Sequence, residues 1–252
     1  MTLEVVLLLK KITLQMMDIF QKTLLGQIPL RKSEIVQAIV SSGIETLPII
    51  SVSTAFTGLV VTNEIAWHLH ESLQSVTMMP GFTGQFVVRE LGIAIPALLI
   101  VANSGASTTA EIGTMKITDQ IDALTLLGID PISFLVFPRF IASMISMSCL
   151  IVISVFITLI CASAVAVLKY HFTVPEYFNA TVHFIHPKDL VGALIKGVVF
   201  GAVIPIISCA YGFQCKGGAE GVGLATTNSV VTSTLTVICL DFLLTYLFTL
   251  LF

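Results

Sequence analysis

The sequence is dominated by a succession of long stretches that contain no charged residue. Such stretches cover residues 46–63, 91–110, 140–168 and 221–240, and residues 190–210 contain no charge except Lys196. A helix needs about 20 mostly apolar residues to cross roughly 30 Å of hydrocarbon. Each stretch, with its flanking residues, reaches that length. The sequence therefore predicts five membrane-spanning helices.

The composition supports a membrane protein and excludes several other classes. Apolar residues make up 56% of the 252 residues and charged residues 11%, and the mean hydropathy is +0.99. A soluble domain has about a quarter of its residues charged, so a water-soluble enzyme is excluded. With 12 Lys and Arg against 15 Asp and Glu, no basic excess exists for binding nucleic acid. The five cysteines show no disulfide or zinc-ligand spacing.

The predicted fold is an all-α polytopic membrane protein that forms one domain over residues 1–252. Transmembrane helices are expected at about 40–66, 84–107, 139–168, 189–210 and 228–250, with polar segments at 108–138 and 211–227. Residues 1–28 place charged and apolar side chains on opposite helical faces, which predicts an amphipathic helix lying in the headgroup plane. A signal peptide fits poorly, because Lys10 and Lys11 follow the first apolar residues instead of preceding them.

The basic residues predict the orientation. With the amino terminus in the cytoplasm and five spans, eight Lys and Arg residues fall inside, against only Lys169 and Lys188 outside. The eight are Lys10, Lys11, Lys22, Arg31, Lys32, Lys116, Arg139 and Lys216. The carboxyl terminus is then expected on the periplasmic side.

Two polar segments face the cytoplasm in this orientation. In residues 103–139, Glu111, Met115, Thr118 and Asp122 follow helical spacing, which predicts a short cytoplasmic helix. A solvated connector is the alternative, although about thirty residues is long for a connection without a task. The second segment, Cys215 to Ser229, contains four glycines but no Gly-x4-Gly-Lys-Ser/Thr string. Nucleotide binding by this chain is therefore not expected.

Four charged residues fall at or within the predicted spans: Arg89, Glu90, Lys196 and Asp241. A charge at mid-membrane costs at least about 2.5 to 3.5 kcal/mol, so such residues usually face a cavity or a partner. We hypothesise that Arg89 and Lys196 donate hydrogen bonds to a lipid phosphate. Two structural alternatives remain open: Asp241 pairs across the helix bundle, and Glu90 only neutralises Arg89.

No catalytic or metal constellation emerges from the sequence. Ser104 lacks the nucleophile-elbow pattern and an activating histidine and acid. His68, His70 and Glu71 follow Trp67, and His183 and His186 are three residues apart. Metal binding is one interpretation of these groups, and a membrane-interface cluster beside an anchoring tryptophan is the favoured one.

Four sequence strings resemble the MlaE/YrbE family, the permease subunits of MCE-associated, Mla-type lipid-transport ABC systems. They are AEIGTMKITDQIDALTLLGIDP, LVFPR, KGGAEGVGLATTNSVV and LDFLLT. Their order and spacing match over nearly the whole chain. The resemblance implies a homodimeric permease in the bacterial inner membrane. It also implies a cytoplasmic ABC ATPase as partner, with a STAS-domain subunit as a further candidate, and a periplasmic ring of MCE-domain proteins.

The resemblance also assigns roles to residues. It implies that residues 108–138 contain the coupling segment that docks on the ATPase, and that four charged residues face the lipid cavity. The cavity residues are Arg89, Glu90, Lys196 and Asp241; the coupling residues are Glu111, Gly113, Thr114, Met115, Asp119, Gln120, Asp122 and Leu124. Asp119 replaces a Glu that is usual in the family, and Leu224 and Asn228 stand where many relatives have arginine.

The expected function is that of a permease subunit, itself not an enzyme, of an ATP-driven phospholipid transporter that maintains outer-membrane lipid asymmetry. No cofactor is expected in this chain, because ATP and magnesium would bind the partner ATPase. Two alternatives use the same embedded charges: an ion-coupled secondary transporter and an intramembrane lipid-modifying enzyme. The lipid and the direction of transport are not encoded in any pattern that we can interpret.

Overall fold

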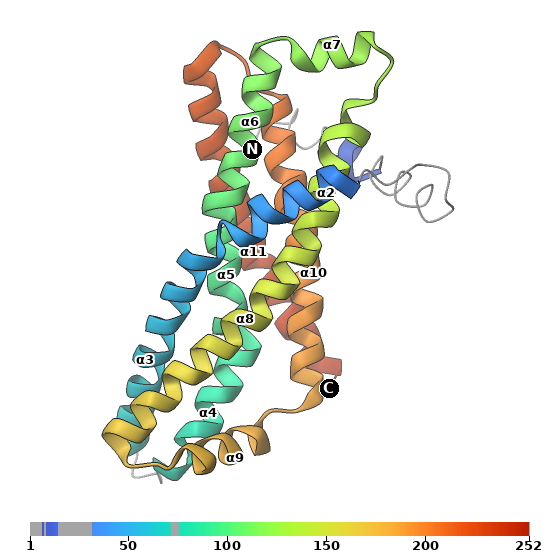
Figure 1. The fold of residues 1–252 in the computed structure, drawn as a ribbon. Coiled ribbons are helices and arrows are strands. Elements are labelled where there is room, and N and C mark those ends of the chain that lie inside the picture. Colours follow the sequence, from blue (N-terminus) through green and yellow to red (C-terminus); the bar gives the residue numbers. More distant parts are fainter. Residues whose placement is uncertain (1–6, 8, 15–31, 72–75, 252) are drawn as a thin grey trace. The chain divides into compact units, whose positions relative to one another are not determined.

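The computed structural model describes residues 7, 9–14, 32–71 and 76–251, almost all of them in helices and none in a β-strand (Figure 1). Among these described residues, five helical stretches are long and apolar enough to cross a membrane: Lys32–Glu71, Met79–Ile117, Ile132–Tyr170, Pro187–Phe213 and Gly218–Leu250. The all-α fold with five spans is thus confirmed. Only residues 7 and 9–14 of the predicted interfacial helix are described, and they are helical.

The helices extend further than the predicted spans, because turns beyond the hydrocarbon core need not be apolar. The first stretch contains α2 (Lys32–Ile39), η1 (Val40–Ile44) and α3 (Leu47–Glu71). The short helix η2 (Val76–Met78) precedes the second stretch. The second stretch contains α4 (Met79–Phe86), η3 (Val87–Leu91), α5 (Gly92–Ile100), η4 (Val101–Gly105) and α6 (Ala106–Ile117). The third contains η5 (Ile132–Val136) and α8 (Phe137–Tyr170), and the last two are α10 (Pro187–Phe213) and α11 (Gly218–Leu251).

Two short helices connect the long stretches. α7 (Gln120–Leu126) lies between the second and third stretches, and α9 (Val174–Phe184) lies between the third and fourth. Most of the predicted Gly-rich loop, residues 211–227, is helical, since α10 ends at Phe213 and α11 begins at Gly218. The turn between them contains Gly217 at φ +88°, a conformation that glycine adopts without steric cost.

The chain forms two compact units. The first unit comprises Met1–Thr46, Ile100–Met147 and Val199–Leu240. Its core is built from α6, α7, η5, α8 and α10, together with Ile12. Asp119, at φ +58°, interrupts the helix between α6 and α7, so the helical spacing from Glu111 to Asp122 is not one continuous helix. Figure 1 shows α7 running from the end of α6 toward η5.

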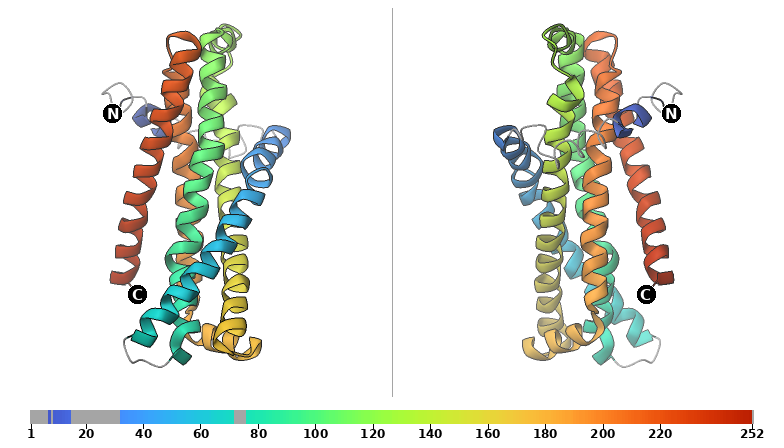
Figure 2. Two further views of the ribbon diagram at one scale, coloured as in Figure 1. Left: turned by 90° about the vertical axis from the view of Figure 1, so that its left-hand side faces the viewer. Right: turned by 90° about the vertical axis from the view of Figure 1, so that its right-hand side faces the viewer.

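The second unit comprises Leu47–Leu99, Ser148–Val198 and Asp241–Phe252. Here α9 packs on α4, and Thr181 Oγ1 donates a hydrogen bond of 3.2 Å to the backbone oxygen of Pro80. Figure 2 shows from two sides that α9 lies where α4 begins and α8 ends. A buried apolar cluster that includes Met79, Ala166 and Tyr177 fills this end of the unit.

Candidate functional site

The four charged residues predicted within the spans are brought together in the second unit. Arg89 and Glu90 lie on η3, Lys196 lies on α10, and Asp241 lies on α11. Lys196 is buried, with only 2% of its surface exposed. We call the group formed by Glu90, Lys196, Asp241 and Thr245 the Lys196 cluster.

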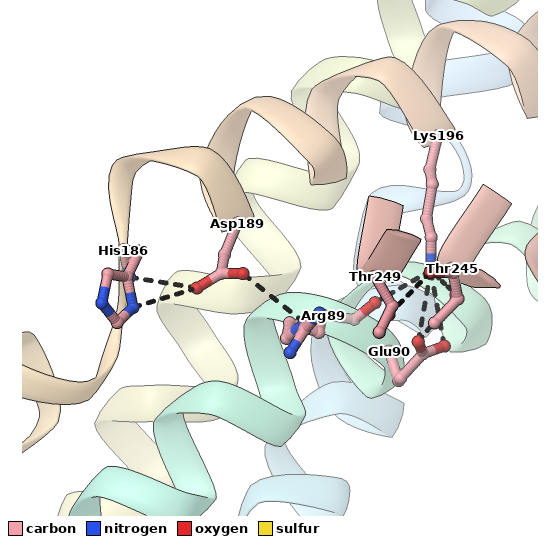
Figure 3. Close-up of polar contacts among 7 residues, drawn as sticks. All are labelled: Arg89, Glu90, His186, Asp189, Lys196, Thr245 and Thr249. Carbon is pink, nitrogen blue, oxygen red and sulfur yellow. Dashed lines mark hydrogen bonds and ion pairs between the residues drawn. The ribbon is translucent and has the colours of Figure 1, made fainter. Parts of the chain in front are cut away.

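The ammonium group of Lys196 is the centre of the cluster. Its Nζ lies 2.7 Å from Asp241 Oδ1 and 3.4 Å from each carboxylate oxygen of Glu90. It also donates hydrogen bonds to Thr245 Oγ1 at 2.7 Å and to the backbone oxygen of Arg89 at 2.9 Å (Figure 3). An ammonium has three N–H donors. All of them are engaged by protein groups, so Lys196 has no donor left for a lipid phosphate in this structure.

The two carboxylates of the cluster compensate the buried lysine. Thr245 Oγ1 donates to Glu90 Oε1 at 2.8 Å, which holds this carboxylate toward Lys196. Burying a charge without such partners would cost several kcal/mol. The expectation that Asp241 pairs across the helices is met, because it joins α11 to α10. The expectation that Glu90 only neutralises Arg89 is wrong, since Glu90 pairs with Lys196.

Arg89 points away from Lys196 and is the accessible cation of the group. Its Nε lies 3.5 Å from Asp189 Oδ1, and 37% of its side chain is exposed. Asp189 also accepts a hydrogen bond from the backbone N–H of His186 at 3.0 Å, which fixes it at the start of α10 (Figure 3). Arg89 and Lys196 both line a small pocket of about 40 Å³, together with Glu90, Lys188 and Asp189 among others. Of the two cations predicted to bind a phosphate, Arg89 is thus the more exposed, and Lys196 is engaged by protein groups.

The backbone at η3 explains part of this arrangement. Residues Val87–Leu91 form one of two π-helical turns in the second helical stretch; the other is η4. Such turns widen the helix locally and often occur at functional sites. Here the turn contains both Arg89 and Glu90, and the carbonyl of Arg89 accepts a hydrogen bond from Lys196 as well. The sequence contains no signal for a π-helical turn that we could have used.

The predicted coupling residues lie in the first unit, and they divide into exposed and inward-facing groups. Thr114, Asp119, Gln120 and Asp122 are exposed, and Asp122 Oδ1 lies 2.8 Å from Lys116 Nζ. Glu111 is also exposed and forms an ion pair of 2.7 Å with Arg139 at the start of α8. Three others face inward: Gly113 is buried, and Met115 and Leu124 pack against the hydrophobic core.

Sequence reasoning missed the most exposed part of this segment. Leu126 and Leu127, at the end of α7, are 89% and 75% exposed. Two adjacent apolar side chains exposed on a polar segment are typical of a contact with another protein. Their exposure could not be read from the sequence, because Ile121 and Leu124 nearby are equally apolar and lie inward.

A larger polar pocket of about 350 Å³ adjoins the same segment in the first unit. Its lining includes Glu111, Arg139, Ser107 and Glu34, from α6, α8 and α2. The ion pair between Glu111 and Arg139 forms part of this wall. Nothing in the sequence pattern indicated this pocket.

Neither histidine group forms a metal centre among the residues that the structure describes, because no three His, Cys, Asp or Glu side chains gather there. The ring of His68 packs edge-on against Trp67, with 5.0 Å between the ring centroids. His186 contributes its backbone N–H to Asp189. In the described residues, His68 therefore makes a packing contact and His186 a hydrogen bond at the start of α10.

Comparison with known proteins gives consistent matches over most of the chain. The family model described as Permease MlaE matches residues 35–247. A probable ABC transporter permease protein of Rickettsia felis is 38% identical over 229 residues, covering 87% of this chain and 85% of the relative. A probable ABC transporter permease protein of Synechocystis is 34% identical and covers 81% and 78%. Protein TRIGALACTOSYLDIACYLGLYCEROL 1 of Arabidopsis thaliana, chloroplastic, is 35% identical, covering 64% and 46%.

Proposed function

This chain belongs to the MlaE permease family, and from that premise we propose that it is the membrane subunit through which an ABC transporter moves phospholipid. It is a multi-pass membrane permease, and its family relatives are named as ABC transporter permeases, so ATP hydrolysis belongs to a separate ATPase. Beyond the family, we propose that the cargo is a phospholipid, that the permease is a homodimer and that its periplasmic partner is an MCE-domain protein. We also propose the inner-membrane location, with the amino terminus in the cytoplasm.

A lipid cargo is supported first by the chemistry of the second unit. Arg89 is partly exposed beside a pocket, while the buried Lys196 cluster fixes the π-helical turn on which it lies. A guanidinium held in this way offers paired N–H donors to a phosphate oxygen. The observation that supports the proposal most is that Lys196 is engaged by protein groups, whereas 37% of the Arg89 side chain is exposed at the same pocket.

The name of one relative supports the same cargo class. The Arabidopsis protein is named after trigalactosyldiacylglycerol, which is a glycolipid. We extend from that name only the class of cargo, a membrane lipid with a polar headgroup. The choice of a phospholipid rests on Arg89, because a cationic donor is suited to a phosphate and is not required by a neutral sugar.

The first unit supplies the surface for the ATPase in this proposal. The exposed Leu126 and Leu127 offer apolar contacts, and Thr114, Asp119 and Gln120 of the same segment are exposed polar groups. An apolar centre with a polar rim is the usual anatomy of a protein interface. Movement of the ATPase would then reach the spans through α6.

The proposal is tested by purifying the permease in detergent with its partners and reconstituting the complex in vesicles that contain a fluorescent phosphatidylglycerol. We expect lipid transfer that requires ATP, and a loss of at least tenfold for Arg89→Gln. The matched control is Lys169→Gln, which removes an exposed cation that contacts Asn63 instead of the pocket. Transfer without nucleotide, or equal transfer by Arg89→Gln and the wild type, would contradict the proposal.

A further inference from the structure

Three helices of the first unit meet at a fully buried hydroxyl group, that of Thr109 on α6. Its Oγ1 lies 2.8 Å from Ser229 Oγ on α11 and 3.1 Å from the backbone oxygen of Ser208 on α10. It lies 3.0 Å from the backbone oxygen of Gly105, one turn back in its own helical stretch. Thr109, Ser208 and Ser229 are all buried. We call this contact the Thr109 junction.

Small residues bring the helices close enough for the junction to form. A Cβ atom at Gly212 of α10 would lie 2.8 Å from Ile112 Cβ and 3.2 Å from the backbone oxygen of Thr109. A Cβ atom at Gly105 would lie 3.2 Å from Ser208 Oγ. Glycines at such positions let helix backbones approach, and interhelical hydrogen bonds then add to the packing. The approach of α6 to α10 is therefore close and directional.

The other threonines of this segment do not join helices in this way. Thr114 donates to the backbone oxygen of Ala110 at 2.8 Å, and Thr118 donates to that of Thr114 at 2.8 Å. Both bonds stay within α6 and its last turn, whereas Thr109 reaches two further helices. A second contact, 2.7 Å between Tyr211 Oη and Thr232 Oγ1, joins α10 to α11 next to the junction.

The position of Thr109 along α6 suggests what the junction does. α6 contains Glu111 and Thr114 and leads into α7, so a displacement of this segment moves Thr109 with it. α10 and α11 continue as unbroken helices to Lys196 and Asp241, each 12 residues from its serine at the junction. α11 contains no proline, so its backbone hydrogen bonds continue through this interval and can transmit displacement along the helix axis. In α10, Pro205 lies between Lys196 and Ser208 and has no N–H to donate. Thr109 thus joins α10 and α11, the helices that bear Lys196 and Asp241, to the segment that faces the ATPase in our proposal.

We propose that Thr109 is a positioning residue, whose hydroxyl transmits movement of the ATPase-facing segment to α10 and α11. The inference rests on the proposed function, because it assumes that an ATPase acts on this segment. It is separate from lipid recognition, since Thr109 lies in the first unit and Arg89 in the second. The chemical requirement is a hydroxyl at residue 109, because an isosteric apolar side chain fills the space and breaks both interhelical bonds.

The test uses the reconstituted complex with Thr109→Val, Thr109→Ser and, as the matched control, Thr46→Val, because the buried hydroxyl of Thr46 donates to the backbone oxygen of Ser42 within its own helical stretch. Two quantities are measured: phosphatidylglycerol transferred per ATP hydrolysed, and the ATP-induced change in hydrogen–deuterium exchange along α11. We expect Thr109→Val to lower transfer per ATP at least tenfold and to remove the change in exchange. Thr109→Ser is expected within twofold of the wild type, and Thr46→Val unchanged.

The inference would be overturned if Thr109→Val transferred as much phosphatidylglycerol per ATP as the wild type and showed the same ATP-induced change in hydrogen–deuterium exchange along α11. An equal loss of transfer, hydrolysis and folded protein in Thr109→Val and Thr109→Ser would also overturn it, because that pattern indicates a packing role alone. If the wild type transfers no phosphatidylglycerol with ATP, the proposed cargo fails instead. The exchange response then still decides the role of Thr109, since it needs only the permease, the ATPase and the nucleotide.

Discussion

Lys196 and Asp241 are separated by 45 residues in the sequence, yet Nζ of the lysine lies 2.7 Å from Oδ1 of the aspartate. Either residue alone would place an unpaired charge inside a membrane-spanning helix. Together they join α10 to α11 within the second unit, with Glu90 as a second carboxylate on the same ammonium group. The pair explains how two strongly polar residues are accommodated in apolar helices.

Removing the lysine should destabilise the protein more than removing an exposed one. Lys196→Met leaves Asp241 and Glu90 without their cation, and breaking a buried pair in this way costs about 3–5 kcal/mol. The measurement is denaturant or thermal unfolding of the purified protein in detergent. Lys169→Met is the control, because Lys169 is exposed and its loss should cost less than about 1 kcal/mol. Equal stability of the two variants would show that the cluster does not stabilise the fold.

A methyl group at Gly58 should separate two helices of the second unit. A Cβ atom there would lie 2.3 Å from the backbone oxygen of Thr158, which cannot turn away as a side chain could. Gly58→Ala is therefore expected to cost about 1–3 kcal/mol by forcing α3 and α8 apart. At Gly223, by contrast, a Cβ atom meets nothing within 4 Å. Gly223→Ala should be neutral or slightly stabilising in the same unfolding assay, and the reverse order would refute this packing.

The exposed leucines of α7 should be needed for the ATPase. Leu126→Ser with Leu127→Ser removes the apolar centre of the proposed interface, and we expect at least a tenfold loss of ATPase that copurifies with the permease. Leu168→Ser is the matched control, since Leu168 is 81% exposed and lies in the second unit. Undiminished copurification of the double variant would place the ATPase contact elsewhere.

The proposed orientation predicts labelling from opposite sides of the membrane. Five spans put residues 118–131 on one side and residues 171–186 on the other. In intact cells or sealed vesicles, Leu127→Cys and Val182→Cys should react with a membrane-impermeant maleimide from opposite faces; both positions are exposed. Native Cys215 should interfere little, because burial raises the pKa of its thiol and lowers the thiolate fraction. Labelling of both from one face would refute the five-span topology.

Much of the candidate site could be found from the sequence, because charge inside an apolar stretch is conspicuous. Arg89, Glu90, Lys196 and Asp241 were identified in this way, and the structure brings all four into one unit. Their partners were not predictable. Thr245 and Asp189 are unremarkable in the sequence, and only the packing of α11 and α10 places them beside Glu90 and Arg89.

The sequence by itself determined that the chain is helical, that it crosses the membrane and which stretches do so. The reason is that lipid admits only helices with apolar surfaces, and a run of 20 such residues is a local property. Only the tertiary structure decided that Lys196 is buried and engaged while Arg89 is partly exposed, and that Thr109 joins three helices. Those relationships depend on which helix faces meet, and helix pairing brings together residues that are distant in the sequence and follow no periodic pattern.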